Sequence, residues 1–522
     1  MTIMNLGIMA HVDAGKTSLT ERLLFEAGVI SAIGRVDDGT TQTDTLALER
    51  QRGITIKSAV VSFEIDGVTV NLIDTPGHPD FIAEVERVLR VLDGAILVIS
   101  AVEGVQAQTR VLFRALQRLR IPTLLFVNKI DRRGANLDAV LCAIAESLSP
   151  QVVAISAACE AGSPLASAVP RNPADAQYRA ELIEVLADGD EHLLAEFVSD
   201  ENAMTFERLH GALITQTRQA LVHPVCFGSA MTGAGVDTIM HAIPTFLPPA
   251  AGDPAGPLSG AVFKVERGPA GEKIAYVRMF NGTLHVRDRV QTGRAGDQRV
   301  TALRVFEHGA AVQQQTVKAG QIGKLWGLAS IQIGDIIGAT PDHAAGYTFA
   351  PPTLETIIVP QRLADRSALH AALAQLAEQD PLINLRHDKL HHELFVSLYG
   401  EVQKEVIQAT LAGEYAIEVE FRESTTICAE RVVGVGQAID QIGKNDNPFL
   451  ATLGLRIEPG PPNSGITFRL EARLETIPLY VYKSVEEFHA TMHQTVRDVL
   501  EQGLFGWQVS DCIVTMTHSG YV

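Results

Sequence analysis

The feature that most constrains the fold of this chain is the octapeptide AHVDAGKT at residues 10–17. It follows an apolar run, NLGIMA at residues 5–10, and it precedes TSLTERLLFEAG, in which Leu19, Leu23 and Leu24 recur at helical spacing. In a strand, a loop and a helix in this order, the loop N–H groups and the positive end of the helix converge on phosphate oxygens. We therefore expect an α/β domain with a phosphate-binding loop.

The loop departs from the usual phosphate-loop pattern at its first position, where Ala10 replaces a glycine. Gly15 is the glycine that the loop requires, because a side chain there would crowd the phosphates, whereas the first position only opens the turn. Lys16 is expected to reach the β- and γ-phosphates, and the Thr17 hydroxyl is expected to bind Mg²⁺. The expected phosphate-binding residues are Ala10, His11, Val12, Asp13, Ala14, Gly15, Lys16 and Thr17.

A second apolar stretch, VTVNLID at residues 68–74, ends at Asp74, whose carboxylate is placed to hold Mg²⁺. The Gly77 N–H follows where it can meet the γ-phosphate, and His78 follows where an attacking water must be oriented. A surface loop histidine is the ordinary interpretation of His78 alone, but a phosphate loop and a metal-holding aspartate beside it favour a catalytic role. The second segment of the site is therefore Asp74, Thr75, Pro76, Gly77 and His78.

The third segment, LLFVNKID at residues 124–131, predicts which base is bound. The Asp131 carboxylate can accept hydrogen bonds from the N1–H and the 2-amino group of guanine, which adenine cannot donate. Asn128 is expected to tie this segment to the phosphate loop and the base, and the aliphatic stem of Lys129 to cover the ring. The expected nucleotide is GTP, held here by Asn128, Lys129, Ile130 and Asp131.

A fourth stretch, VCFGSA at residues 225–230, places Ser229 and Ala230 where backbone N–H groups can meet the guanine O6. A rival sequence, ISAA, occurs at residues 155–158. We prefer the later copy because the residues after it, GAGVDTIMHAIPTFLP, are typical of the helix that closes such a domain. Neither copy is informative by itself.

Between the first two motifs, ERQRGITIKSAVVSF contains Thr55 just after a polar loop. We choose Thr55 as the switch threonine, whose oxygens would contact Mg²⁺ and the γ-phosphate only while GTP is intact. A threonine in a β-strand is the alternative. The loop at residues 35–52 is rich in Gly, Thr and Asp, and it is long enough to order and disorder.

Composition narrows the class of protein. A chain of 522 residues predicts three or four domains at roughly 150 residues each. Its formal net charge of -18 argues against a general nucleic-acid coat. Arg110, Arg114 and Arg118 share a helical side, which we interpret as a solvated face. The five cysteines are scattered without a C-x-x-C pair, and we expect them to be small buried hydrophobic residues.

The longest apolar run, GAILVISAV at residues 94–102, is shorter than the ~20 residues of a membrane-spanning helix and indicates a buried strand. The first residues carry no pattern of a secretory signal and lead directly into a strand. From these observations we expect a cytoplasmic protein that uses no membrane.

Taken together, AHVDAGKT, RGITI, DTPGH, NKID and GSA resemble the GTPase domain of translational GTPases over about residues 1–248. The resemblance implies a phosphate-loop GTPase domain with a doubly wound, mainly parallel sheet. It also implies GTP hydrolysis by water, triggered on the ribosome, with His78 flanked by the apolar Val12 and Ile54. The residues expected to act in catalysis are His78, Lys16 and Thr55, and those expected to bind Mg²⁺ are Thr17, Thr55 and Asp74.

The rest of the chain predicts a multidomain α/β protein. A Pro/Gly-rich linker at residues 246–257 separates the GTPase domain from residues 258–345, where alternating polar and apolar residues predict a β-barrel similar to the second domain of elongation factors. Residues 352–423 mix strands and helices, like the third domain of elongation factor G. Residues 425–522 resemble an incomplete fourth domain of the α+β kind.

Three stretches discriminate among relatives. EQGLFGWQVSDC, PPNSGITF and YGEVQKEVI resemble the ribosomal protection proteins of tetracycline resistance more than elongation factor G. That resemblance implies a monomer that binds the ribosome, both rRNA and ribosomal proteins, and no DNA. The alternatives are a translational GTPase like elongation factor G or a release factor, and a truncated GTP-binding protein without resistance activity.

The family also carries a long loop, a fifth domain and a C-terminal helix that would follow the end of this sequence. On that basis we expect GTP binding and hydrolysis with little or no protection against tetracycline. We also expect an open strand edge, and therefore the lowest local stability, from about Thr425 onward.

The assignment of Asp131 leads to a test of base recognition. We expect Asp131→Asn to shift the preference toward xanthine nucleotides, because their C2 carbonyl accepts a hydrogen bond from the new amide. Competitive binding titrations with GTP and XTP measure the selectivity. A selectivity for GTP over XTP that does not change would contradict the assignment.

Overall fold

The protein is described from a computed structural model. The described residues are 2–34, 41, 49, 54–199, 204–292, 296–340, 349–388, 393–444, 447–462, 464–478, 480–505 and 507–521. The loop 35–52 therefore lies outside the described residues except for Thr41 and Glu49, as do residues 341–348 at the end of the expected barrel domain. In the part of the chain that is described, no helix is both long enough and apolar enough to cross a membrane.

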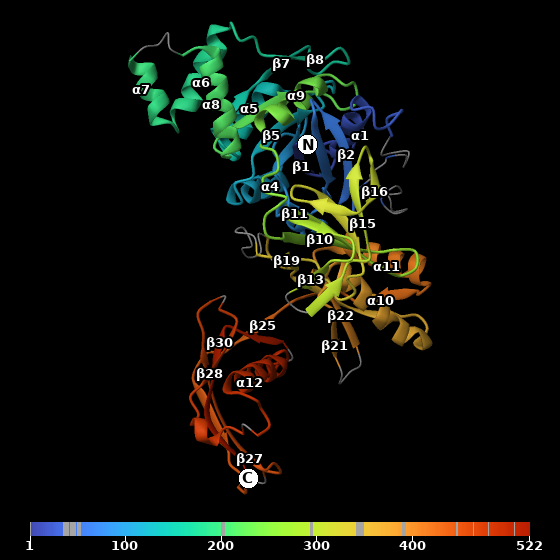
Figure 1. Cartoon of the computed structure of the whole chain (residues 1–522), viewed down its shortest axis with the longest axis vertical. Coiled ribbons are helices and arrows are strands. Elements are labelled where there is room, and N and C mark those ends of the chain that lie inside the picture. Colours follow the sequence, from blue (N-terminus) through green and yellow to red (C-terminus); the bar gives the residue numbers. More distant parts are fainter. Residues whose placement is uncertain are drawn as a thin grey trace. The chain divides into compact units, whose positions relative to one another are not determined.

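The chain divides into two compact units. The first unit consists of Met1–Pro352 and Thr356–Glu423, and the second consists of Thr353–Glu355 and Ser424–Val522. Within the first unit we distinguish an α/β segment (residues 2–247), a barrel (residues 259–338) and a third segment (residues 356–421). Figure 1 shows these segments in sequence colours.

The α/β segment is built on a sheet with the strand order β2-β3-β1-β4-β5-β9-β6. Only the β2–β3 pair is antiparallel; the other described pairs are parallel. The strands are β1 (Thr2–Ala10), β2 (Ala59–Ile65), β3 (Val68–Asp74), β4 (Gly94–Ser100), β5 (Thr123–Asn128), β6 (Val152–Ala154) and β9 (His223–Phe227). This arrangement confirms the expected doubly wound, mainly parallel sheet.

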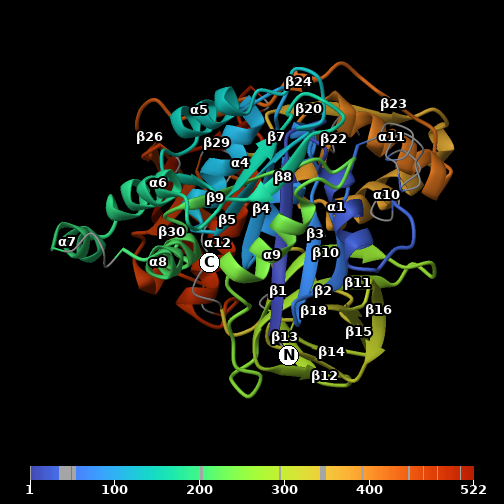
Figure 2. The ribbon, with the colours of Figure 1, turned by 90° about the horizontal axis from the view of Figure 1, so that it is seen from above.

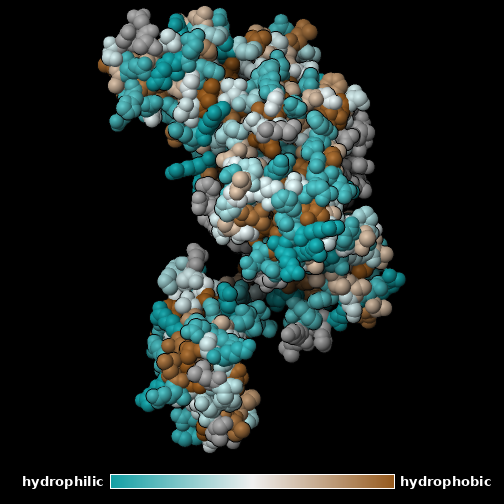
Figure 3. All heavy atoms as spheres, in the orientation of Figure 1, coloured by the Kyte–Doolittle hydropathy of each residue, from teal (hydrophilic) through white to brown (hydrophobic). Residues whose placement is uncertain are grey.

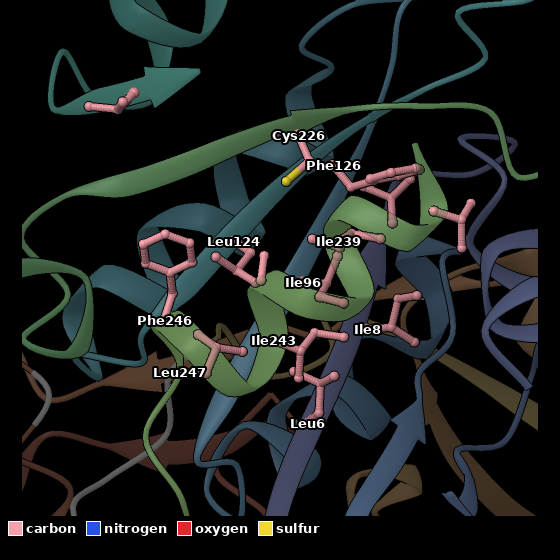
Figure 4. Close-up of a cluster of buried hydrophobic side chains, with 14 of the residues drawn as sticks. Leu6, Ile8, Ile96, Leu124, Phe126, Cys226, Ile239, Ile243, Phe246 and Leu247 are labelled. Carbon is pink, nitrogen blue, oxygen red and sulfur yellow. The ribbon is translucent and has the colours of Figure 1, made fainter. Parts of the chain in front are cut away.

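Helices cover both faces of this sheet, which is why its central strands are continuous apolar runs. One apolar core lies between the sheet and α1, α6, α8 and α9, and another lies between the sheet and α3, α4 and α5. Figure 2 shows these helices around the strands, and Figure 4 shows Ile239 and Ile243 of α9 beside Leu6, Ile8 and Ile96. The helices are α1 (Lys16–Glu26), η1 (Pro79–Phe81), α3 (Ile82–Leu89), α4 (Ala107–Arg118), α5 (Leu137–Ser147), α6 (Ala176–Ala187), α7 (Glu191–Ser199), α8 (Phe206–Arg218) and α9 (Val236–Phe246), and a hairpin is formed by β7 (Ser156–Cys159) and β8 (Ser167–Pro170).

The register of the parallel strands brings the sequence motifs to one edge of the sheet. Ile8 pairs with Asp74, and Ala10 pairs with Val98. Farther along the same edge, Ser100 pairs with Asn128. Since the carboxyl ends of parallel strands lie together, the loops that follow β1, β3, β4, β5 and β9 meet there.

The barrel is an antiparallel sheet with the strand order β14-β13-β19-β10-β11-β18-β15-β16 and a separate pair β12-β17. Its strands alternate inward and outward side chains: in β15, Leu303 and Val305 are buried in the barrel core and Arg304 is exposed. The strands are β10 (Ser259–Arg267), β11 (Lys273–Asn281), β12 (Thr283–His285), β13 (Arg289–Thr292), β14 (Gly296–Arg299), β15 (Ala302–Glu307), β16 (Ala310–Gln314), β17 (Thr316–Lys318), β18 (Ile322–Trp326) and β19 (Ile336–Gly338). The expected β-domain is thus present.

The third segment packs two helices against a sheet of order β21-β22-β20-β23. Helix α10 buries Leu369, Leu373 and Leu376 at helical spacing, and α11 buries Ile407 and Leu411. The elements are β20 (Leu354–Pro360), η3 (Leu363–Asp365), α10 (Arg366–Gln379), η4 (Pro381–Ile383), β21 (Arg386–Asp388), β22 (Glu393–Leu398), α11 (Glu401–Tyr415) and β23 (Val419–Phe421). Strands and helices alternate in this segment, as its sequence predicts.

The second unit contains a sheet of order β26-β27-β30-β28, and α12 contributes Phe488 and Val496 to its core. The last strand is paired on both sides, so the edges of this sheet are β26 and β28. Large apolar side chains such as Val433 and Leu504 are exposed, and Figure 3 shows apolar atoms on the visible face of this unit. The elements are β24 (Thr425–Thr426), β25 (Ala429–Arg431), β26 (Gly436–Asp440), β27 (Ala451–Pro459), β28 (Ile466–Leu470), η5 (Leu474–Thr476), α12 (Val485–Leu500), β29 (Gln508–Ser510) and β30 (Cys512–Tyr521). The expected low stability of this region stays a prediction.

The expectation that the cysteines are buried is wrong for three of them. Cys226 and Cys512 are buried, but Cys142, Cys159 and Cys428 are exposed, and all five are free thiols. Cys142 lies on the outer side of α5, the helix that buries Val140 and Ile144 against the sheet. A residue between these two positions turns toward solvent because the helical period is 3.6 residues.

A buried ion pair joins the barrel to the α/β segment. The Arg278 guanidinium, 1% exposed, donates from Nη2 to the two carboxylate oxygens of Asp93 at 2.9 and 3.2 Å. The same carboxylate accepts hydrogen bonds from the backbone N–H and the side-chain amide of Asn5 at 2.8 and 2.7 Å. Burial lowers the pKa of Arg278, and the negative charge of Asp93 opposes that effect.

We expect Arg278→Met to lower the free energy of unfolding by about 3 kcal/mol, because the Asp93 carboxylate, which is only 14% exposed, loses its charged partner. Unfolding in urea, followed by circular dichroism, measures the change. Arg304→Met on the exposed face of the barrel is the matched control and should change stability by less than about 0.5 kcal/mol. Equal losses in the two variants would contradict the importance of the buried pair.

Candidate nucleotide site

The phosphate loop connects β1 to α1 through two residues with left-handed backbone conformations. Asp13 has φ 63° and Gly15 has φ 89°. Left-handed residues in a turn aim successive N–H groups into one concave space, which suits an anion. A Cβ on Gly15 would lie 2.3 Å from Asn128 Nδ2, so a side chain is excluded by a protein neighbour as well as by strain. Ala10 and Ala14 are fully buried, and the substituted first position fits within the core.

Lys16, Thr17, Thr55 and Asp74 meet beside this loop. The Lys16 ammonium forms an ion pair with the Asp74 carboxylate and donates to Thr55 Oγ1 at 3.2 Å. The hydroxyls of Thr17 and Thr55 are hydrogen-bonded at 3.2 Å. All four side chains are less than a tenth exposed, so the carboxylate depends on a nearby cation for compensation of its charge.

This corner fits a magnesium ion by the chemistry of its donors. Two hydroxyl oxygens and one carboxylate are the hard ligands that Mg²⁺ takes from proteins, with nucleotide phosphates and water completing the shell. In the protein alone, the Lys16 ammonium supplies the positive charge next to Asp74. The three residues predicted to bind the metal, Thr17, Thr55 and Asp74, are therefore brought together.

The DTPGH segment is attached to the phosphate loop by its first residues. Thr75 is buried, and its hydroxyl donates to the carbonyl of Ile8 at 2.8 Å. Gly77 lies against the loop, where a Cβ would be 3.4 Å from the Ala10 carbonyl and 3.6 Å from that of His11. These contacts place the residues after Asp74 directly beside the loop.

His78 lines the same cavity as Val12 and Ile54. Its Nδ1 accepts the backbone N–H of Asp80 at 3.2 Å, which places the proton of a neutral ring on Nε2. Asp80 Oδ1 is 3.4 Å from the same nitrogen. The side chain is one-quarter exposed, so water can reach it.

Asn128 connects three parts of the site. Its Nδ2 donates to the Ala14 carbonyl at 2.8 Å, and its Oδ1 accepts the Ala230 N–H at 2.9 Å. Ile130 is buried, while Lys129 and Asp131 line the cavity. The predicted tie to the phosphate loop is present, and the tie to Ala230 is a further one.

Ser229 and Ala230 line the cavity, but their N–H groups already have partners. Ser229 donates to the Ala234 carbonyl at 2.8 Å, and Ala230 donates to Asn128. These two bonds hold the loops to each other, and the expected contact of Ser229 and Ala230 with the guanine O6 stays a prediction. The rival copy has a different place, since Ser156 accepts the Phe227 N–H at the sheet.

Sequence reasoning missed two residues of this cavity. Glu103 follows β4 and accepts from the Lys129 ammonium with both carboxylate oxygens at 3.2 Å. Arg22 donates to the carbonyls of Ala230 and Met231 at 3.0 and 2.6 Å. The position of Glu103 just beyond the end of a parallel strand is a signal that could have identified it.

His11 of the phosphate loop is buried, and its Nδ1 lies 3.0 Å from the Thr109 hydroxyl of α4. Burial lowers the pKa of His11 below its ordinary value, so the ring is neutral at pH 7. The loop residue thus interacts with the neighbouring helix as an uncharged group.

The loops together enclose a cavity of about 750 Å³. Its lining includes Lys16 and Thr55, which meet beside the phosphate loop, and Asp131 and Met231, from the loops that follow β5 and β9. Its volume is in the range of small-molecule sites. A phosphate-binding end and a base-reading end in one cavity suit a nucleotide.

Known protein families match the α/β segment, the barrel and the third segment separately. Residues 1–249 match the elongation factor Tu GTP-binding domain, residues 257–340 match elongation factor G domain 2, and residues 349–423 match elongation factor G domain III. An oxytetracycline resistance protein from Streptomyces rimosus is 49% identical to this chain. The match covers all of this chain and 79% of the relative's own length. The chain belongs to the ribosomal protection family of tetracycline resistance proteins.

Other members of this family are also similar over the whole chain. The tetracycline resistance protein TetM from Streptomyces lividans is 43% identical, with 81% of its own length matched. TetP from Clostridium perfringens is 41% identical over 99% of this chain and 78% of its own. This ribosomal protection protein is thus a translational GTPase that binds GTP.

A solved structure of a protein from Thermus thermophilus has the same fold. The two structures superpose with a TM-score of 0.71 and are 24% identical in sequence. The match covers all of this chain and 81% of the Thermus thermophilus chain. At this identity the likeness concerns the fold alone. It agrees with the α/β segment, barrel and third segment described above.

Gly15 offers a direct test of the loop geometry. We expect Gly15→Ala to weaken GTP binding by about 100-fold or more, ~2.7 kcal/mol, because the new methyl group displaces Asn128 and distorts the loop. Gly28→Ala is a matched control, since Gly28 also has a positive φ, of 71°, but has no neighbouring atom within 4 Å of a Cβ. Fluorescent GTP titrations measure both variants, and equal losses would show that backbone strain alone accounts for the effect.

Proposed function

We propose that this ribosomal protection protein binds GTP with Mg²⁺ and hydrolyses it on the ribosome, with His78 as the residue that orients the attacking water. The observation that carries the proposal is the single cavity in which the phosphate loop, Thr55, the DTPGH segment, the NKID segment and Ser229 meet. The names of the relatives, which are tetracycline resistance proteins, support the biological setting.

Guanine is bound at the Asp131 end of the cavity. The Asp131 carboxylate accepts from the N1–H and the 2-amino group, and the stem of Lys129 covers the ring. Lys129 is held in place by its ion pair with Glu103, at 3.2 Å. Asn128 keeps the base-binding segment at a constant distance from the phosphate loop through its bond to Ala14.

Thr17, Thr55 and Asp74 would hold Mg²⁺, and the ion would supply positive charge beside the β- and γ-phosphates. Lys16, which pairs with Asp74 in the protein without nucleotide, would turn to the phosphates, because they present a stronger negative charge than one carboxylate. Binding of nucleotide thus exchanges one buried ion pair for another. The exchange makes the position of Thr55 dependent on the bound nucleotide.

Hydrolysis requires one water in line with the γ-phosphorus. His78 donates a hydrogen bond from Nε2–H to that water and so fixes its orientation, while Val12 and Ile54 limit the entry of other water molecules. The water oxygen bonds to phosphorus, the bond to the β–γ bridging oxygen breaks, and GDP and phosphate are the products. Lys16 stabilises the charge that develops on the leaving oxygen.

The setting of this reaction is part of the proposal. We propose a cytoplasmic monomer that binds rRNA and ribosomal proteins, with neither DNA nor membrane as a partner. We propose the domain limits 1–248, 258–345, 352–423 and 425–522, which the separate cores of the α/β segment, barrel and second unit support. The last of these four is the α+β segment with α12 on its sheet.

We expect His78→Ala to lower ribosome-stimulated turnover by at least about 100-fold, ~2.7 kcal/mol or more of transition-state stabilisation, while GTP affinity stays nearly unchanged. Phosphate release with purified 70S ribosomes measures turnover, and a fluorescent GTP titration measures affinity. His241→Ala, on an exposed surface of α9, is the matched control and should behave like the unmodified protein. Turnover that survives in His78→Ala would exclude His78 as the catalytic residue.

A further inference from the structure

Helix α11 of the third segment begins without a cap of its own. Its N-cap residue is Gly400, which has no side chain to accept the first backbone N–H groups of the helix. Such groups are usually satisfied by an oxygen at the N-cap position, and leaving them without one costs about 1 kcal/mol. The partner of these groups comes from a distant part of the chain.

Asp80 of the α/β segment supplies that oxygen. Its Oδ2 accepts the N–H of Val402 at 2.9 Å and that of Gln403 at 3.3 Å. The side chain is only 12% exposed, so these bonds are shielded from water. A carboxylate at a helix N-terminus is also favoured by the helix dipole.

The same aspartate contacts His78. Its backbone N–H donates to His78 Nδ1 at 3.2 Å, and its Oδ1 lies 3.4 Å from that nitrogen. The absence of a side chain on Gly400 makes this approach possible, since a Cβ there would lie 2.3 Å from Asp80 Oδ1. The first turn of α11 therefore fixes the position of Asp80, the residue that contacts the His78 imidazole.

A second set of contacts attaches α3, the helix that follows His78, to the third segment. Gln403 donates to Asp380 at 3.3 Å, and Asp380 forms an ion pair with Arg87 of α3. Arg87 also pairs with Glu84 at 2.7 Å, which accepts from the Ser58 hydroxyl at 3.1 Å. The segment that carries Thr55 contacts the third segment directly, because the Lys57 ammonium donates to Gln379 Oε1 at 3.3 Å.

We propose that Asp80 is a positioning residue for His78, and that the N-terminus of α11 sets its position. The inference rests on the proposed function, because it concerns the orientation of the imidazole toward water. With α11 in place, Asp80 holds the Nδ1 side of the ring and leaves Nε2–H directed away from it. When α11 is displaced, Asp80 loses both helix N–H groups and the imidazole is no longer oriented. The third segment therefore controls the efficiency of hydrolysis without touching the nucleotide.

The first test compares two changes at Asp80. We expect Asp80→Ala to lower the kcat of ribosome-stimulated hydrolysis about tenfold, with the KM for GTP and the affinity for fluorescent GTP within about twofold of the unmodified protein. Asp80→Asn keeps an oxygen that can accept the helix N–H groups, so it should recover most of the activity. A loss of kcat that is equal in the two variants, or a parallel loss of GTP affinity, would overturn the positioning role.

The second test acts from the third segment. Gly400→Ala places a methyl group against the Asp80 carboxylate and should lower kcat in the same way as Asp80→Ala. Gly413→Ala, on the same helix and with no atom within 4 Å of its Cβ, is the matched control and should retain full turnover. Thermal melting of both variants checks that the helix remains folded.

The outcomes separate this inference from the proposed function. If His78→Ala abolishes stimulated turnover while Asp80→Ala and Gly400→Ala behave like the unmodified protein, the inference is wrong and the catalytic role of His78 stands. If His78→Ala retains turnover, both are wrong. A reduced kcat in Asp80→Ala and Gly400→Ala, with Gly413→Ala unaffected, supports the control of His78 by α11.

Discussion

The parallel pairing of β1 with β3 and β4 is the constraint on which the nucleotide site depends. This pairing aligns the end of β1, where the phosphate loop begins, with Asp74 at the end of β3 and with the end of β4. A slip of one residue would turn every side chain of a strand to the opposite face, so the apolar cores on both faces hold the register firmly. The chemistry of the site is therefore secured by packing that involves none of its polar residues.

Hydrogen bonds and ion pairs then fix the loops relative to one another, which strand pairing alone does not do. Asn128 holds both the phosphate loop and the base-binding loop, so the two ends of the cavity stay at one distance. Lys16 and Asp74 are both buried, and each neutralises the charge of the other. Such a pair is suited to an exchange of partners, in which Lys16 turns to the phosphates and Asp74 to a metal ion. Between segments, Arg278 of the barrel and Asp80 beside α11 specify orientation more strictly than apolar contact does, because hydrogen bonds depend on angle.

The sequence by itself determined the nucleotide segments and the fold class, because strand, loop and helix patterns are local and the phosphate and guanine motifs depend on a few adjacent residues. It also indicated the linker before the barrel and the α/β character of the third segment. It was wrong about three cysteines, because residue type alone does not say which positions meet a core: Cys142 is on the outer side of α5, Cys159 is in the hairpin strand β7, and Cys428 lies between β24 and β25. The loop at 35–52 lies outside the described residues except for Thr41 and Glu49, and its expected response to nucleotide stays a prediction.

Only the tertiary structure decided which residues meet across long distances in the chain. Glu103 lies beside Lys129, and Asp80 caps a helix that begins more than 300 residues later, at Glu401. It also showed that the Ala230 N–H donates to Asn128, which joins the loops after β5 and β9. No local pattern encodes these pairings, because they arise where separately folded segments come to rest against one another and each buried polar group must find a partner.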